Sequence, residues 1–185
     1  MINRDQIRKN RLEKVEKLQH LGLNPYPASV KRSHTIDGAL ADFSKLSQGE
    51  KEVSLAGRIL SVRQHGGSAF LDIQDGTGRI QIFLRRDTLG PKLYEFFEEY
   101  IDLGDFIQVT GVLFKTKAGE KTLKADNLEI AAKSLFPPPS EWYGLKDPEA
   151  RYRQRYLDIL LNAETRKTFE IRSQVVTEIR SFLDK

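Results

Sequence analysis

Between Val53 and Ile130, apolar residues alternate with polar ones in five short runs. Successive side chains of a strand point to opposite faces, so a period of two places the apolar residues of each run on one face. Helical spacing interrupts this pattern once, from Pro91 to about Ile101. The pattern therefore limits this part of the chain to a small β structure with one helix inserted after the third strand.

Turn residues mark the ends of these runs and define five predicted strands. Their expected bounds are Val53–Gln64, Ser68–Gln74, Arg79–Arg85, Phe106–Phe114 and Lys121–Ile130. Gly57, inside the first strand, predicts a bulge or strong bend where that strand passes between two sheet edges. Three strands, a helix and two strands within about eighty residues are typical of the OB fold. We therefore predict a mainly-β fold: a five-stranded OB-fold barrel with a helix between the third and fourth strands. Further helices are expected before and after the barrel in the sequence.

The residues before the barrel predict helices. The segment Met1–Gly22 has apolar residues at helical spacing, and a shorter helix is expected around Ile36–Phe43. Arg4, Arg8 and Arg11 lie along one side of the first helix. A basic face of this kind is usually solvated, and contact with phosphate groups is the alternative.

A proline-rich stretch, Phe136–Ser140, predicts a stiff linker because consecutive prolines hold an extended conformation. Beyond it, Asp147 is expected to cap a helix reaching about Leu161, and Asn162 to cap a second helix. The second helix is apolar on two sides, which requires partner layers, so we expect a longer parent protein. The predicted domains are a helical extension (1–50), the barrel (51–134), the linker (135–146) and the start of a further domain (147–185).

The composition narrows the function classes. A formal net charge of +4 weakly favours polyanionic binding partners. The absence of Cys excludes disulfides and thiolate metal sites and suits a reducing compartment, so a cytoplasmic location is expected. No apolar run approaches the ~20 residues that span a membrane. The three histidines lack ligand-like spacing, and we expect no metal site and no complete catalytic site in this chain.

Strand parity separates the predicted core from a predicted binding face. In the second strand Phe70 points away from the apolar face, and in the third strand Gln81 and Phe83 do the same. The outer face of these two strands is where OB folds bind oligonucleotides. An exposed ring can stack on a base, and an amide can match a uracil edge. The alternative is that the rings pack under a loop and that Gln81 has no role.

Two charged residues are further candidates for this face. Arg63, near the end of the first strand, is suited to a phosphate or a base edge. Glu120 lies in the loop between the fourth and fifth strands, and its carboxylate would repel phosphate but accept a hydrogen bond from a base. On the pattern alone, a solvated surface side chain is the favoured interpretation of both residues.

Three segments resemble one family, the bacterial-type lysyl-tRNA synthetases of class II. They are Gly78–Gln81, Leu113–Glu120 and Asp147–Asp158, and the resemblance extends over essentially the whole chain. It implies that the barrel binds the uridine-rich lysine anticodon. It also implies that Arg63, Phe70, Gln81 and Glu120 contact the anticodon, whereas Phe83 receives no such support. The aspartyl and asparaginyl enzymes share the barrel, but the Leu113–Glu120 stretch favours lysine.

The resemblance has implications for the parent protein as well. It implies a lysine–tRNA ligase that uses ATP and Mg²⁺ and works as a homodimer. The helix Thr168–Asp184 is similar to the opening of the family's first class-defining motif, and the ATP- and lysine-binding motifs would follow after Lys185. This chain alone is therefore expected to bind tRNA without catalysis and without a cofactor. The alternatives are a stand-alone single-strand binder and an aspartyl or asparaginyl homologue.

Overall fold

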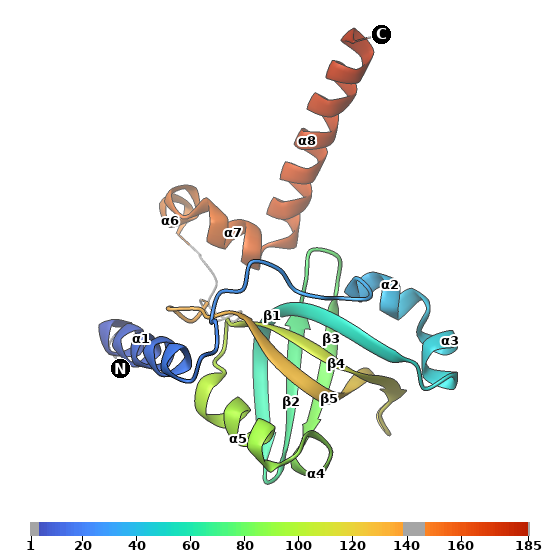
Figure 1. Ribbon diagram of the computed structural model, residues 1–185. Coiled ribbons are helices and arrows are strands. Elements are labelled where there is room, and N and C mark those ends of the chain that lie inside the picture. Colours follow the sequence, from blue (N-terminus) through green and yellow to red (C-terminus); the bar gives the residue numbers. More distant parts are fainter. Residues whose placement is uncertain (1–3, 139–146, 185) are drawn as a thin grey trace. The chain divides into compact units, whose positions relative to one another are not determined.

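The five alternating runs form a closed barrel in the order β1-β2-β3-β5-β4 (Figure 1). The computed structural model describes residues 4–138 and 147–184. The strands are β1 (Glu52–His65), β2 (Ser68–Gln74), β3 (Arg79–Arg85), β4 (Phe106–Lys115) and β5 (Lys121–Ala132). Neighbouring strands are antiparallel except β3 and β5, which run parallel and close the barrel. The predicted OB-fold barrel is confirmed.

The first strand belongs to both sides of the closed sheet. Its residues Glu52–Arg58 pair with β4, and Arg58–His65 pair with β2. At the crossing, a Cβ on Gly57 would lie 2.9 Å from the carbonyl oxygen of Gln74, so the backbones approach too closely for a side chain. The predicted bend is present, but the register shift lies between Ile59 and Ser61 rather than at Gly57 itself.

Alternate residues of the strands fill the barrel as predicted. The inward side chains of β2 and β3 are all buried; they are Ala69, Leu71, Ile73, Ile80, Ile82 and Leu84. The predicted helix is α5 (Pro91–Tyr100), which contributes the buried rings of Tyr94 and Phe97. A one-turn helix, α4 (Arg86–Leu89), precedes it and was not predicted, because four residues are too few to show helical periodicity.

The N-terminal helix α1 (Arg4–His20) is held by the basic side chain of Arg11 as well as by the apolar side chain of Leu18. Its buried residues are Arg11 and Leu18. The Arg11 guanidinium donates to the carbonyl oxygens of Ser134 at 2.7 Å and Leu103 at 2.9 Å. The expectation that Arg11 is solvated or meets phosphate is therefore wrong, because α1 covers main-chain carbonyls that need a donor.

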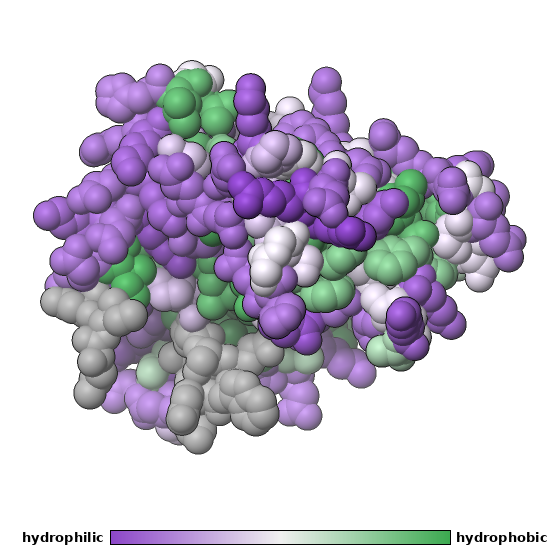
Figure 2. All heavy atoms as spheres, turned by 90° about the horizontal axis from the view of Figure 1, so that it is seen from below, coloured by the Kyte–Doolittle hydropathy of each residue, from purple (hydrophilic) through white to green (hydrophobic). Residues whose placement is uncertain are grey.

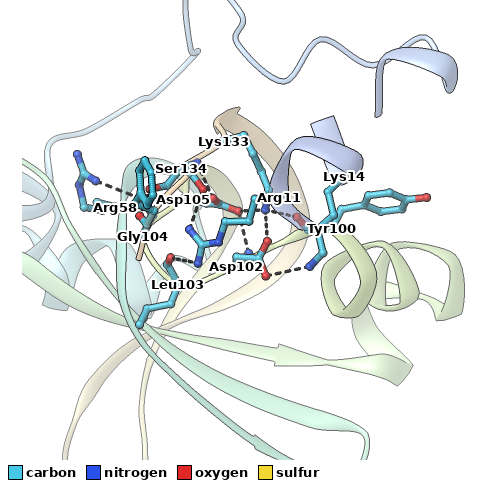
Figure 3. A network of polar contacts seen from close by, with 11 residues as sticks. Arg11, Lys14, Arg58, Tyr100, Asp102, Leu103, Gly104, Asp105, Lys133 and Ser134 are labelled. Carbon is cyan, nitrogen blue, oxygen red and sulfur yellow. Dashed lines mark hydrogen bonds and ion pairs between the residues drawn. The ribbon is translucent and has the colours of Figure 1, made fainter. Parts of the chain in front are cut away.

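A buried ionic cluster, shown in Figure 3, lies beside this contact. The side chain of Lys133 is fully buried and donates to Asp105 at 2.6 Å, to Asp102, and to the carbonyl oxygen of Tyr100 at 2.6 Å. Asp102 also pairs with Lys14 of α1 at 2.9 Å. Burial raises the pKa of Asp105. Burial acts the same way on Asp102, but Lys133 and Lys14 outweigh it and lower the pKa of that carboxyl.

Two short helices, α2 (Ile36–Ala41) and α3 (Phe43–Gln48), replace the single helix expected around Ile36–Phe43. The first of them is tied to the β2–β3 turn by Asp75. This carboxylate accepts the main-chain N–H groups of Ile36 at 3.0 Å, Thr77 at 2.7 Å and Gly78 at 2.9 Å. Burial would raise the pKa of Asp75, but these hydrogen bonds outweigh it and hold the pKa below its ordinary value.

We expect Asp75→Ala to lower the free energy of unfolding by about 2–3 kcal/mol at pH 7, because hydrogen bonds to a buried carboxylate are lost. The folded-state pKa of Asp75 lies below the unfolded value, so its contribution is present above about pH 4 and disappears as the pH falls through the folded-state pKa. Urea unfolding at pH 7 and pH 3 should therefore show a difference between variant and wild type that shrinks in acid. Asp87→Ala is the matched control, since the Asp87 side chain is 76% exposed. An equal loss at both pH values would contradict the assignment.

The chain divides into two compact units, Met1–Pro137 and Pro138–Lys185. The second contains α6 (Pro148–Arg153), α7 (Arg155–Leu161) and α8 (Ala163–Leu183). Asp147 and Asn162 cap α6 and α8 as predicted. The helix expected to run unbroken to Leu161 is interrupted at Gln154.

The interruption at Gln154 is bridged by one buried carboxylate. Asp158 of α7 accepts from Arg151 of α6 at 2.8 Å and from Arg155 at 2.6 Å, so it holds the two short helices together. The apolar side chains of α8 are exposed within this unit; they are Phe169, Ile171, Val175, Val176, Ile179, Phe182 and Leu183. Most of the predicted linker, residues 139–146, lies outside the described residues, as do residues 1–3.

Hydrophilic residues cover most of the surface in the view from below, and apolar residues appear between them as separate patches (Figure 2). This agrees with the 30% of charged residues in the sequence. Among the described helices, none has the length and apolar character needed to span a membrane.

Candidate nucleic-acid interface

A groove of about 640 Å³ lies over the outer face of the barrel, next to the β4–β5 loop. It is lined by Arg63, Phe70, Asp72, Arg79, Gln81, Thr116, Ala118 and Glu120. The four predicted site residues, Arg63, Phe70, Gln81 and Glu120, all belong to this lining. The structure thus brings together side chains from β1, β2, β3 and a loop that are far apart in the sequence.

Strand register explains why the side chains of β1, β2 and β3 meet in the groove. One row of paired residues contains Arg63, Phe70 and Phe83, on β1, β2 and β3. The next row runs across four strands and contains Ser61, Asp72, Gln81 and Thr122. Residues two apart in a strand share a face, so both rows lie on the outside of the barrel.

The first row presents an aromatic surface. The ring of Phe70 stacks on that of Phe83, with centroids 4.8 Å apart and an interplanar angle of 29°. The centroid of the Phe83 ring in turn lies 6.2 Å from that of Phe114. Only Phe70 of these three lines the groove. Of these rings, Phe70 is therefore the one that faces the groove, and it packs against Phe83.

The second row is centred on the carboxylate of Asp72, whose side chain is 15% exposed. Asp72 accepts a hydrogen bond from the Ser61 hydroxyl and pairs with Arg79 at 3.2 Å and with Arg63 at 3.5 Å. One guanidinium nitrogen of Arg63, Nη2, approaches Asp72. The Arg63 side chain is nevertheless 62% exposed, so a ligand could reach it. Gln81 accepts from the Thr122 hydroxyl at 3.0 Å through Oε1.

The β4–β5 loop holds Glu120 at the rim through its main chain. The Glu120 N–H donates to the Thr116 hydroxyl at 3.1 Å, and its carbonyl oxygen accepts from the Thr116 N–H at 3.0 Å. Gly119 has a φ of +88°, a left-handed conformation that suits glycine in this turn. The Glu120 side chain is exposed at the rim. The loop therefore fixes the main chain of Glu120 and leaves its carboxylate exposed to solvent.

Sequence reasoning missed four residues of the lining. Asp72 and Arg79 point outward by strand parity, and the same alternation that selected Gln81 was the signal for them. Thr116 and Ala118 lie in the loop, where no periodicity exists to select them. Within residues 4–138 and 147–184, no three His, Asp or Glu side chains gather to hold a metal ion.

Comparison with known proteins defines the class of this barrel. Residues 53–131 match the tRNA_anti-codon family, described as an OB-fold nucleic acid binding domain. The chain is 45% identical over 182 residues to the lysine–tRNA ligase of Fervidobacterium nodosum and 46% identical over 181 residues to that of Carboxydothermus hydrogenoformans. These alignments cover 97% and 98% of the chain but 35% and 36% of the relatives. The predicted resemblance to lysyl-tRNA synthetases is thus confirmed, for about one third of their length.

Proposed function

We propose that this chain is the anticodon-recognition region of a lysine–tRNA ligase, and that the groove binds bases of a lysine anticodon. One observation carries the proposal. Arg63, Phe70, Gln81 and Glu120 line a single groove on an OB-fold barrel, on a chain similar along nearly its whole length to lysine–tRNA ligases.

The charges of the groove favour a base over a phosphate. Two guanidinium groups, of Arg63 and Arg79, face two carboxylates, of Asp72 and Glu120. This balance gives no net attraction for an anion, and both carboxylates repel phosphate. A neutral base is suited to it, because the Phe70 ring can stack on the base face while donors and acceptors meet its edge.

A uracil edge is complementary to these groups. It carries an N–H donor between two carbonyl acceptors, and in the groove Glu120 is an acceptor while Gln81 and Arg63 offer donors. The excess positive charge of the chain, +4, attracts the RNA backbone outside the groove. In this arrangement the groove contributes selectivity and the surrounding surface contributes affinity.

The intact protein, in this proposal, attaches lysine to its tRNA in the cytoplasm, with ATP and Mg²⁺ bound by residues outside this chain. The exposed apolar side chains of α8 support a homodimer, since a helix of this kind is stable only when another layer covers it. The chain itself contributes recognition and not chemistry.

A competition experiment tests the proposed function. We expect the chain to prefer a stem–loop with a lysine anticodon over the same stem–loop with aspartate, asparagine or arbitrary anticodons. Binding to all of them should weaken with salt. For each phosphate neutralised, log K should fall by roughly 0.7 per tenfold rise in salt concentration. Equal affinity for all loops would instead identify a sequence-tolerant single-strand binder. Preference for an aspartate or asparagine anticodon would identify the corresponding homologue.

A further inference from the structure

Thr122 lies beneath the groove and does not line it. Its side chain belongs to β5, next to Gln81 of β3 in the parallel pair that closes the barrel, and the residue is fully buried. A buried hydroxyl in a barrel wall needs a partner. Thr122 has two on the groove side, Oε1 of Gln81 at 3.0 Å and the main-chain carbonyl oxygen of Glu120 at 3.3 Å.

The shorter of these contacts takes the hydroxyl proton, and it is made to the oxygen of the Gln81 amide. An amide group can turn by 180°, which exchanges its acceptor oxygen for its donor nitrogen. The Thr122 hydroxyl donates to Oε1, so the oxygen side of the amide faces the buried hydroxyl. The NH₂ side is then left for the groove that Gln81 lines. The hydroxyl has a single proton, so the longer contact, with the carbonyl oxygen of Glu120, is not a second full hydrogen bond.

We propose that Thr122 is a positioning residue for base recognition: it presents Gln81 to the groove as a hydrogen-bond donor. This proposal rests on the proposed function. A donor at this point suits the carbonyl oxygen at position 4 of uracil, whereas cytosine carries an amino group there, so that two donors would meet. Thr122 therefore favours uridine over cytidine without touching the RNA.

The test compares the affinity for a uridine-rich lysine anticodon stem–loop with that for loops in which one anticodon uridine is replaced by cytidine. In Thr122→Val, which keeps the shape and removes the hydroxyl, we expect the uridine-to-cytidine affinity ratio to fall by a factor of about 2 to 10. Thr122→Ser keeps the hydroxyl and should keep the ratio. Thr110→Val is the matched control, because its hydroxyl bonds Ser54 at 3.1 Å, away from the groove.

A double-mutant cycle separates positioning from general destabilisation. If Thr122 acts through Gln81, then Thr122→Val should leave the ratio unchanged when Gln81→Met is already present. The proposal is overturned if Thr122→Val keeps the wild-type ratio, if Thr122→Ser loses it as well, or if the two substitutions act independently. A wild-type chain that does not prefer the lysine loop at all would instead contradict the proposed function.

Discussion

Replacing Lys133 with Met is expected to lower the free energy of unfolding of the first unit by about 3–5 kcal/mol, the cost of leaving a buried charge without its partner. The ammonium group of Lys133 is fully buried between Asp105 and Asp102 (Figure 3). Asp102 retains Lys14 after the substitution, but Asp105, also fully buried, loses the ammonium group with which it forms an ion pair. Urea unfolding at neutral pH measures the effect.

The pH dependence of the Lys133→Met variant identifies the carboxyl responsible. Burial raises the pKa of Asp105, and Lys133 is the main charge that counteracts this, so its removal should raise the pKa of Asp105 further. A folded-state pKa above the unfolded value stabilises the fold at low pH, and this contribution is lost as the pH rises through the folded-state pKa. The deficit of the variant should therefore shrink in mild acid, at a higher pH than the deficit of Asp75→Ala, because the folded-state pKa of Asp105 is raised and that of Asp75 is lowered.

Two controls accompany the Lys133 experiment. Adding Asp105→Asn to Lys133→Met should recover part of the lost stability, because it removes the unpaired charge. Lys92→Met, at an exposed lysine on α5, should change the stability by less than about 0.5 kcal/mol. If Lys133→Met is as stable as the wild type, the cluster does not hold the first unit together.

Replacing Phe70 with Leu is expected to weaken binding of the lysine anticodon stem–loop by about 1–3 kcal/mol, the range found when a stacking ring is replaced by Ala. Leu keeps an apolar side chain beside Phe83 but offers no ring face to a base. The loss should be the same at two salt concentrations, because stacking releases no counterions. Fluorescence or filter binding at both concentrations measures it.

Phe70→Tyr is the matched control, since it keeps the ring, and its affinity should stay close to that of the wild type. Arg63→Ala gives a second comparison, because a contact with phosphate would reduce the salt dependence whereas a contact with a base edge would not. Unchanged affinity in Phe70→Leu would show that the ring packs against Phe83 only and does not stack on RNA.

Strong local patterns predicted most of the barrel. The bounds of β2 and β3 were predicted as found, because alternation and an Asp-Gly turn define a hairpin within a few residues. Elements without such signals were missed or misplaced: α4 is one turn long, and the break at Gln154 has no proline or glycine to mark it. The burial of Arg11 had no local signal either, because its partners, Leu103 and Ser134, are distant in the sequence.

The sequence by itself determined where the strands lie along the chain and the face to which each of their side chains points, because both follow from periods of a few residues. It placed Phe70 and Gln81 on the outer face without the structure. Only the tertiary structure decided that Arg63 and Glu120 join them, and that Thr122 lies behind Gln81, 41 residues away. The physical reason is closure of the barrel: β5 pairs with β3 in parallel only once β1 has bent between β2 and β4. No local pattern encodes that contact.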